Sequence, residues 1–396
     1  MMAEFKIRRS LENIEEYKVE HVDAKIIVSA NESNYPMPEA VAAKVAQLTA
    51  NFPFNRYPPM KAENLCGTIA SELGFDIDNI KIGNGSSELL EMACYAFGGA
   101  GKKIAFPYPS FGMYNVFARM SDSTPAPYAL TEDGYIDADA VIGFCKAEQP
   151  SLLIICNPNN PTGNYNQLPV MERIVASVNC PVLVDEAYME FADGRDVPPT
   201  DMRPLNKLWL VAGSTLSLVG QYSNLICLRT FSKAYGLAGL RCGYAAGAIG
   251  LMRLLGKTLI PYQVNAYSLM VAQTVYENKL LYKDRIKEIK FERDKMAAEL
   301  KQMGFRVWDS ATNFLLLRAE GALAEKLAKS YYVKSGEQLS ALQASGKLIY
   351  RYLLDNGILT ADFTSHPALT GCLRVTVGLP AENAVIMEKL RQLVRG

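Results

Sequence analysis

Short apolar runs alternate with longer helical patterns between about Pro38 and Leu259, and no other feature limits the fold as strongly. Each run is nearly continuous in apolar residues, as a strand covered on both faces should be. This alternation predicts an α/β fold with βαβ units around a mostly parallel central sheet. The predicted strands are residues 80–82, 103–106, 152–156, 182–185, 225–230 and 243–246.

The second part of the chain has a different character. Residues 266–303 are charged and helix-forming, and we interpret them as a long helix that connects two domains. Strands predicted at 306–308, 313–317 and 373–377 belong to a smaller α/β domain. In the first part, helices are predicted at 40–48, 62–73, 87–97, 110–120 and 171–178. Two stretches, 193–221 and 331–346, lack a clear period and are interpreted as loops.

This organisation predicts three regions in a chain of 396 residues, which is long enough to bury a substantial core. Residues 1–37 are expected to form an N-terminal arm that joins the smaller domain. Residues 38–262 form the large domain, and residues 263–396 form the small C-terminal domain.

Charge and composition exclude several classes of function. Lysine plus arginine and aspartate plus glutamate both total 41, with no block of like charges, which argues against a nucleic-acid surface and a polybasic membrane anchor. No apolar run approaches the roughly 20 residues of a membrane helix, and residues 1–20 lack a signal-peptide core. The eight cysteines are scattered without a C-x-x-C pair, so we expect a cytoplasmic protein without a metal site.

Four polar motifs follow predicted strands, and open parallel sheets bind ligands outside the carboxyl ends of their strands. The first, Gly-Asn-Gly-Ser-Ser-Glu at 83–88, is a glycine-rich turn that opens a helix, where free amides and the helix dipole favour an anion. Taken alone, it is equally well explained as a serine-capped helix start. The second, Asn-Pro-Asn-Asn-Pro-Thr-Gly at 157–163, predicts a rigid turn that supplies a fixed side-chain amide.

The third motif, Asp-Glu-Ala-Tyr at 185–188, places a carboxylate at a strand end and a phenol three residues later, although Asp185 alone could be a helix cap. The fourth, Arg-Thr-Phe-Ser-Lys-Ala-Tyr-Gly-Leu-Ala-Gly-Leu-Arg at 229–241, sets Lys233 at the end of a buried strand, after the hydroxyls of Thr230 and Ser232 and before Arg241. Desolvation and a nearby cation lower the pKa of such a lysine, so its amine can condense with an aldehyde. The alternative is a surface lysine, the usual fate of this residue type.

In this order, the four motifs resemble those of the pyridoxal-phosphate (PLP) dependent aminotransferases of fold type I, class I/II. The amino-acid sequences of these motifs are most similar to those of histidinol-phosphate aminotransferases. The segments Tyr-Pro at 57–58, Pro-Ser-Phe-Gly-Met-Tyr at 109–114 and Leu-Arg-Val-Thr-Val-Gly at 373–378 extend the resemblance over nearly the whole chain. It implies a three-layer PLP-dependent transferase fold with a large cofactor-binding domain and a smaller α/β domain.

The resemblance also implies roles for individual residues. Lys233 would bond covalently to the cofactor and move a proton between the substrate α-carbon and the cofactor's C4′ carbon. Asp185 would keep the pyridine nitrogen protonated, so that the ring accepts electrons. Tyr188 and Asn160 would hydrogen-bond the phenolate oxygen of the ring, and Phe111 would stack on the ring.

The cofactor phosphate would be held by a helix start, hydroxyls and an arginine, whose fork suits phosphate oxygens. Tyr57 would reach this phosphate from a neighbouring subunit, which implies a homodimer with shared active sites. The implied phosphate ligands are Gly85, Ser86, Ser87, Thr230, Ser232, Arg241 and Tyr57.

For the substrate, the resemblance implies that Arg374 grips a carboxylate and that Tyr17 and Asn31 line the pocket. The family carries an arginine near a Gly-Ile pair in the small domain, where this chain has Ala361 followed by Asp362. Losing a cation and gaining an anion disfavours a phosphorylated substrate. Arg351, or another cation near 331–346, is a candidate replacement.

The first hypothesis is therefore a transaminase that moves an amino group between an amino acid or amino-alcohol phosphate and a 2-oxo acid, with glutamate and 2-oxoglutarate as the expected pair. A decarboxylase of the threonine-phosphate type would use the same lysine and aspartate, and an aromatic amino acid aminotransferase is a further alternative. A dinucleotide-binding protein is disfavoured because the chain has no G-x-G-x-x-G with a downstream acid and no G-x-x-x-x-G-K-[ST]. The balanced charge disfavours a cofactor-binding regulator of DNA.

Overall fold

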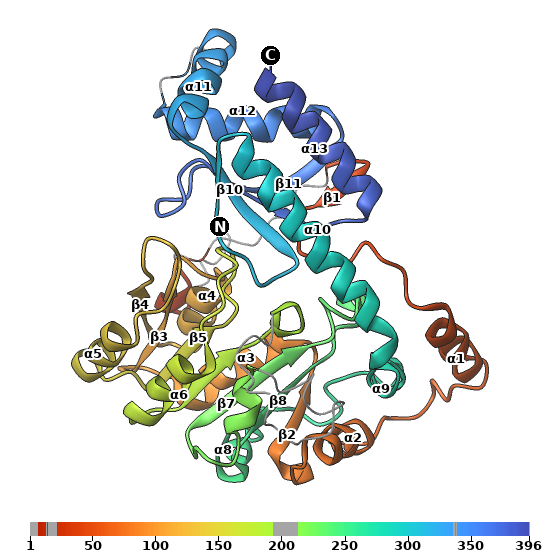
Figure 1. Cartoon of the computed structure of the whole chain (residues 1–396). Helices are drawn as coiled ribbons and strands as arrows, with labels where there is room; N and C mark the ends of the chain where they lie inside the picture. Colours follow the sequence, from red (N-terminus) through yellow and green to blue (C-terminus); the bar gives the residue numbers. More distant parts are fainter. Residues whose placement is uncertain are drawn as a thin grey trace, which may run out of the picture.

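The computed structural model describes residues 7–12, 14, 22–192, 213–335, 337 and 339–395. Within these residues the larger sheet has seven strands, which lie side by side in the order β2-β8-β7-β6-β5-β3-β4 (Figure 1). β8 is antiparallel to both of its neighbours, and the other neighbouring strands are parallel. The prediction of a mostly parallel central sheet is confirmed. The strands are β2 (Ile80–Gly83), β3 (Lys103–Tyr108), β4 (Thr124–Ala129), β5 (Leu152–Cys156), β6 (Val182–Asp185), β7 (Leu225–Thr230) and β8 (Gly243–Gly247).

Helices cover both faces of this sheet, which explains the nearly continuous apolar runs. In β5, Leu152 and Ile154 point into one apolar cluster, whereas Leu153 and Ile155 point into the other. This is the two-residue alternation of a strand buried on both sides. The first cluster includes α3 (Ser86–Phe97), α4 (Met113–Met120) and α8 (Ile249–Leu255), and the second includes α2 (Glu63–Leu73), α5 (Ala138–Glu148), α6 (Leu168–Ser177) and α9 (Ala266–Glu277).

β4 lies at the edge of the sheet and was not predicted, because its sequence Thr-Pro-Ala-Pro-Tyr-Ala carries two prolines. Pro125 and Pro127 are two residues apart and therefore present their backbone nitrogens to the same side. The backbone N–H of Thr124, on the alternate side, donates to Lys102 O at 2.8 Å. The missing N–H groups thus face away from the sheet, where an edge strand tolerates proline.

A smaller sheet in the described residues has the order β1-β11-β12-β10-β9, with β1 parallel to β11 and the other pairs antiparallel. It lies above the larger sheet in Figure 1, and α10 runs between the two. Its elements are β1 (Ile26–Val28), β9 (Phe305–Val307), β10 (Phe314–Ala319), β11 (Ile358–Phe363), β12 (Cys372–Thr376), α10 (Lys283–Gln302), α11 (Gly321–Ser335), α12 (Ala341–Asp355) and α13 (Pro380–Arg395).

Two local predictions need correction. The single helix expected at 266–303 is divided, because Asn278 ends α9 by donating its side-chain amide to Thr274 O at 2.7 Å, and α10 starts at Lys283. Asparagine competes for backbone groups in this way and favours helix ends. The stretch 331–346 is not a long loop, since its two ends belong to α11 and α12. The remaining elements are α1 (Glu39–Thr49) and the 3-10 turns η1 (Arg9–Leu11), η2 (Ile77–Asn79), η3 (Met189–Phe191), η4 (Thr215–Leu218), η5 (Ala238–Leu240) and η6 (Lys279–Tyr282).

The domain boundaries after residues 37 and 262 stay a prediction. β1, from the predicted N-terminal arm, pairs with β11 of the smaller sheet. By contrast α9, which follows the second boundary, packs against α1 and α2.

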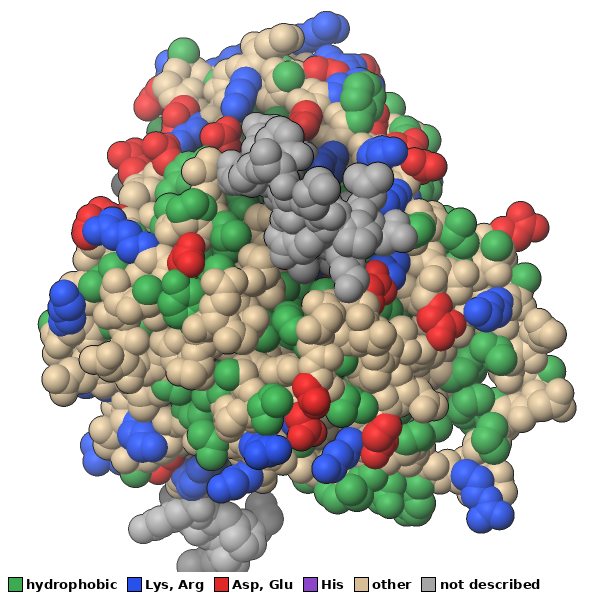
Figure 2. Space-filling model, turned by 60° about the horizontal axis from the view of Figure 1, so that its bottom comes forward, with side chains coloured by type: hydrophobic (Ala, Val, Ile, Leu, Met, Phe, Trp, Pro, Cys, Tyr) green, Lys and Arg blue, Asp and Glu red, His purple; other side chains and the backbone are tan. Residues whose placement is uncertain are grey.

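The surface agrees with the balanced composition. On the face shown in Figure 2, basic and acidic side chains are interspersed. Among the described helices, none is long and apolar enough to cross a membrane.

Candidate active site

The predicted motifs meet at one edge of the larger sheet. β3, β5, β6 and β7 are parallel, and β2 runs in the same direction because both β2 and β7 are antiparallel to β8. Their carboxyl ends therefore lie side by side. Backbone bonds join the segments that follow: Asn157 N donates to Asp185 O, and Glu186 N donates to Leu228 O, both at 3.0 Å.

Lys233 follows β7, and its Nζ donates to Ala30 O at 3.0 Å. Burial lowers the pKa of Lys233 to about 8, and the positive charges of Arg374 and Arg241 act in the same direction. The carboxylates of Glu32 and Asp185 oppose this shift. A much larger fraction of the side chain is thus neutral amine near pH 7 than for an exposed lysine.

Asp185 ends β6 and is only 7% exposed. Its carboxylate accepts hydrogen bonds from the hydroxyl of Tyr114 at 2.9 Å and from the backbone N–H of Ala187 at 3.2 Å. Burial nevertheless raises the pKa of Asp185 to about 6. A cation placed against this carboxylate would reverse the shift, because an opposite charge favours the ionised form.

Tyr114 was not assigned a role from the sequence, although it lies in one of the segments that carry the resemblance. It projects from the first turn of α4 and is buried. Its ring is perpendicular to that of Phe111, with 5.5 Å between the centroids. The hydrogen bond between Tyr114 and Asp185 exists because α4 lies beside the end of β6 in the fold. Local sequence gives no direct signal for this contact.

Residues of the smaller sheet complete the cluster. Arg374, on β12, donates from Nη1 to Asn160 Oδ1 and from Nη2 to Ser29 O, both at 2.6 Å. Asn31 donates its side-chain amide to the Tyr188 hydroxyl at 2.9 Å. Burial raises the pKa of Tyr188 to about 12, so it is a neutral hydrogen-bonding group. The predicted site thus spans both sheets.

The amino end of α3 forms a cradle with Arg241. Gly85 precedes the helix with φ +84°, and a Cβ at this position would lie 2.6 Å from Arg241 Nη2. Ser86 and Ser87 begin the helix. In the same motif as Arg241, the hydroxyl oxygens of Thr230 and Ser232 are 3.0 Å apart. A helix start, hydroxyls and a guanidinium fit the phosphate of the implied cofactor.

One predicted residue stands apart, and another is not described. The Tyr57 side chain is 82% exposed, and its ring stacks on that of Tyr262 with 4.7 Å between centroids. Tyr17 lies outside the described residues.

A sequence profile of the family "Aminotransferase class I and II" matches residues 23–390. The chain belongs to this family. It is a PLP-dependent aminotransferase of fold type I, as predicted.

Relatives of this aminotransferase cover nearly all of it. The histidinol-phosphate aminotransferase of Thermoanaerobacter pseudethanolicus is 31% identical over 394 residues, which span 99% of this chain and 100% of the relative. The histidinol-phosphate aminotransferase of Chlorobaculum tepidum is 31% identical over 386 residues, which span 97% of this chain and 99% of the relative.

Solved structures share the fold. The Sinorhizobium meliloti histidinol-phosphate aminotransferase in complex with pyridoxal-5'-phosphate has a TM-score of 0.77 at 22% identity, covering 94% of this chain and 92% of that one. The L-threonine-O-3-phosphate decarboxylase of Porphyromonas gingivalis has a TM-score of 0.71 at 21% identity. The match covers 94% of this chain and 100% of the decarboxylase. The fold therefore does not distinguish these two reactions.

Beneath the site of the aminotransferase lies a buried ionic network that was not predicted. Arg229 donates to Glu186 and to Glu190, both at 2.9 Å, and to Ser214 Oγ at 3.0 Å. Glu186 also accepts two bonds from Thr215 at 2.7 Å. Arg229 and Glu186 each belong to one of the predicted motifs, but they pair with each other inside the protein and not in the site.

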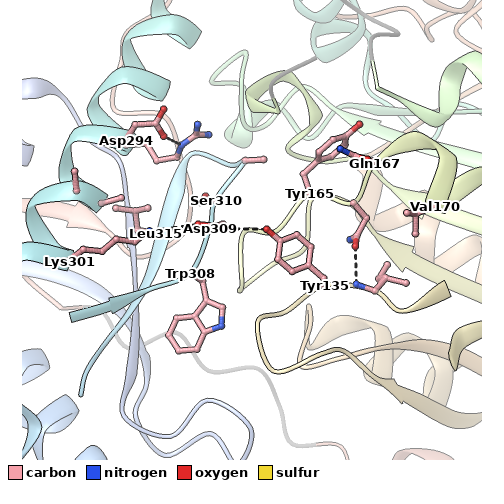
Figure 3. Close-up of a pocket in the computed structure, with 16 residues that line it drawn as sticks. Tyr135, Tyr165, Gln167, Val170, Asp294, Lys301, Trp308, Asp309, Ser310 and Leu315 are labelled. Atoms are coloured by element: carbon pink, nitrogen blue, oxygen red, sulfur yellow. Dashed lines mark hydrogen bonds and ion pairs between the residues drawn. The ribbon is translucent and has the colours of Figure 1, made fainter. Parts of the chain in front are cut away.

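A cavity of about 780 Å³ lies elsewhere in the aminotransferase, between α10, the start of α6 and the β9–β10 connection (Figure 3). Tyr135 points across it and donates to Asp309 at 3.2 Å. None of the predicted site residues is among those lining this cavity. Cavity size therefore does not locate the site, whereas the charged groups at the strand ends do.

Proposed function

We propose that this aminotransferase moves an amino group between an amino acid or an amino-alcohol phosphate and a 2-oxo acid, with glutamate and 2-oxoglutarate as the common pair. The observation that carries the proposal is Lys233, whose pKa is lowered to about 8 in a cluster with Asp185 and Arg374. It supplies an amine that loses its proton at a pH well below that of an exposed lysine, beside a guanidinium suited to a substrate carboxylate.

When bound, PLP supplies an electron-withdrawing ring that takes up the electron pair left as the substrate α-carbon loses its proton. Lys233 Nζ is proposed to accept and return that proton. Asp185 is proposed to face the pyridine nitrogen, since a protonated nitrogen would stabilise a carboxylate whose pKa burial raises to about 6.

The other groups are proposed to bind and orient the cofactor and the substrate. Asn160 and Tyr188 are proposed to contact the ring oxygen, with Phe111 against the ring face. The cradle of Gly85, Ser86, Ser87, Thr230, Ser232 and Arg241 is proposed to hold the phosphate. Arg374 is proposed to hold the substrate carboxylate, and Asn31 supports this edge through its bond to Tyr188.

We also propose a homodimer in which Tyr57 reaches the partner's phosphate. Its exposed ring stacks on that of Tyr262, which lines one pocket together with Met60 and Ile260, and these three side chains are exposed as well. Apolar surface gathered in this way is typical of protein interfaces. A cytoplasmic location is likewise proposed, supported by eight buried cysteines that are all free.

Glutamate added to the PLP-loaded protein tests the reaction. We expect the cofactor absorbance to shift as the amino group is transferred, with one 2-oxoglutarate formed per site. The Lys233→Ala variant should bind PLP without this conversion. An unchanged spectrum after full loading would exclude glutamate as donor, and release of carbon dioxide from an amino acid phosphate would favour the decarboxylase instead.

A further inference from the structure

The residues around Arg374 indicate which kind of substrate side chain the site suits. In the antiparallel pairing of β11 with β12, Ala361 lies directly opposite Arg374. Alanine adds neither charge nor length at this position. The guanidinium of Arg374 is therefore not joined there by a second cation.

Aromatic rings lie next to the guanidinium instead. The Arg374 guanidinium is 5.7 Å from the ring centroid of Phe363. Phe363 is 6.0 Å from His366, and His366 is 5.6 Å from Tyr108, between ring centroids. Tyr108 ends β3 and is 40% exposed. The three rings therefore form a continuous series, which we name the ring wall, from β11 of the smaller sheet to the site edge of the larger one.

The ring wall does not replace the missing cation. Burial lowers the pKa of His366 below its ordinary value, so this imidazole is neutral near pH 7. Arg351, a candidate replacement, pairs with Glu337 at 3.9 Å, and its guanidinium lies 5.3 Å from the ring centroid of Tyr331. Lys347 pairs with the same glutamate at 3.5 Å. These two charges are directed to the α11–α12 region.

We propose that the ring wall binds the substrate side chain and that the preferred amino donors are aromatic amino acids without a phosphate. This inference rests on the proposed function. Rings at these separations contribute specific contacts to an inserted aromatic group. A doubly charged phosphate would have to give up its water against apolar ring surface without gaining a second cation. Arg374, oriented by Asn160 and Ser29, would take the carboxylate of the amino acid.

The first test uses the PLP-loaded enzyme and compares phenylalanine, tyrosine, histidinol phosphate and glutamate in single-turnover half-reactions. We expect kcat/KM for phenylalanine and tyrosine to exceed that for histidinol phosphate about a hundredfold. A preference for histidinol phosphate would overturn the inference and leave the proposed aminotransferase reaction standing. If glutamate and the other three donors all fail to react, the proposed function fails instead.

Variants of the ring wall separate its role from folding. His366→Ala should lower the ratio of kcat/KM for phenylalanine to that for glutamate about tenfold, mainly through KM. Ala361→Arg should shift preference toward histidinol phosphate. Phe291→Ala, which removes a ring that is 67% exposed on α10, is the matched control and should leave the ratio unchanged. An unchanged ratio in His366→Ala would contradict the assignment.

A binding measurement is independent of turnover. By calorimetry, the PLP-loaded enzyme should bind 3-phenylpropanoate at least about tenfold more tightly than propanoate, and His366→Ala should reduce this difference. Equal affinity for the two acids would overturn the inference even if amino transfer is observed. A clear preference would support it even if no tested donor reacts.

Discussion

At the scale of single residues, burial sets the chemistry of Lys233. Its pKa is lowered from an ordinary 10.5 to about 8, with burial as the main cause and Arg374 as the next. At a pH below its pKa, the lysine is mostly protonated, and a protonated amine has no lone pair with which to attack an aldehyde. The cofactor-free protein should therefore react with pyridoxal faster as pH rises through about 8 and reach a plateau above it.

Arg374→Met should move this midpoint to higher pH, because it removes a positive charge that disfavours the protonated amine. Stopped-flow absorbance gives the rate constants, and Lys233→Ala gives the background from other lysines. A midpoint near 10 in the parent protein would show that the amine is not activated by its surroundings.

Arg229 illustrates a second residue-scale effect, the cost of an unpaired buried charge. Its replacement by methionine would leave Glu186 and Glu190 in the interior without their cation, and we expect a loss of about 3–5 kcal/mol in the free energy of unfolding. The control is Arg253→Ala, whose ion pair with Asp78 is 70% and 48% exposed and should contribute less than about 1 kcal/mol. Urea unfolding of the two variants measures the difference, and similar losses would refute the argument.

At the scale of elements, the start of α3 is shaped to leave room for Arg241. Gly85→Ala should weaken PLP binding about tenfold or more, because its Cβ would meet the guanidinium at 2.6 Å and φ is +84°. Gly112→Ala, before α4, is the control, since nothing lies within 4 Å of its added Cβ and φ is −56°. Absorbance titration gives both dissociation constants. Equal affinities would mean that the cradle tolerates a methyl group.

At the scale of the whole molecule, the proposed shared site can be tested by mixing inactive variants. Lys233→Ala and Tyr57→Ala homodimers should both be weak or inactive. In a mixed dimer, one site would combine Lys233 of one subunit with Tyr57 of the other, so activity should appear after co-expression. Pairing Tyr57→Ala with the double variant K233A/Y57A provides the control. No recovery in the mixed dimer would argue against Tyr57 acting across subunits.

The sequence by itself determined the elements whose signal is local. The bounds of β5, β6 and β7 match the predicted runs, because strands buried on both faces are marked by continuous apolar residues. The strand-end motifs and their order likewise determined the family and the cofactor. β4 was missed because its proline pattern has meaning only at a sheet edge, which local sequence does not reveal.

The tertiary structure alone decided which distant side chains share an environment. Arg374 and Asn160 are 214 positions apart but form a 2.6 Å bond, and Asn31 meets Tyr188 across 157 positions. The lowered pKa of Lys233 and the raised pKa of Asp185 follow from the same enclosure. Hydrogen bonds and desolvation depend on distance in space. Motifs can therefore name the reacting groups, but only the contacts between segments of the two sheets set their charge and their surroundings.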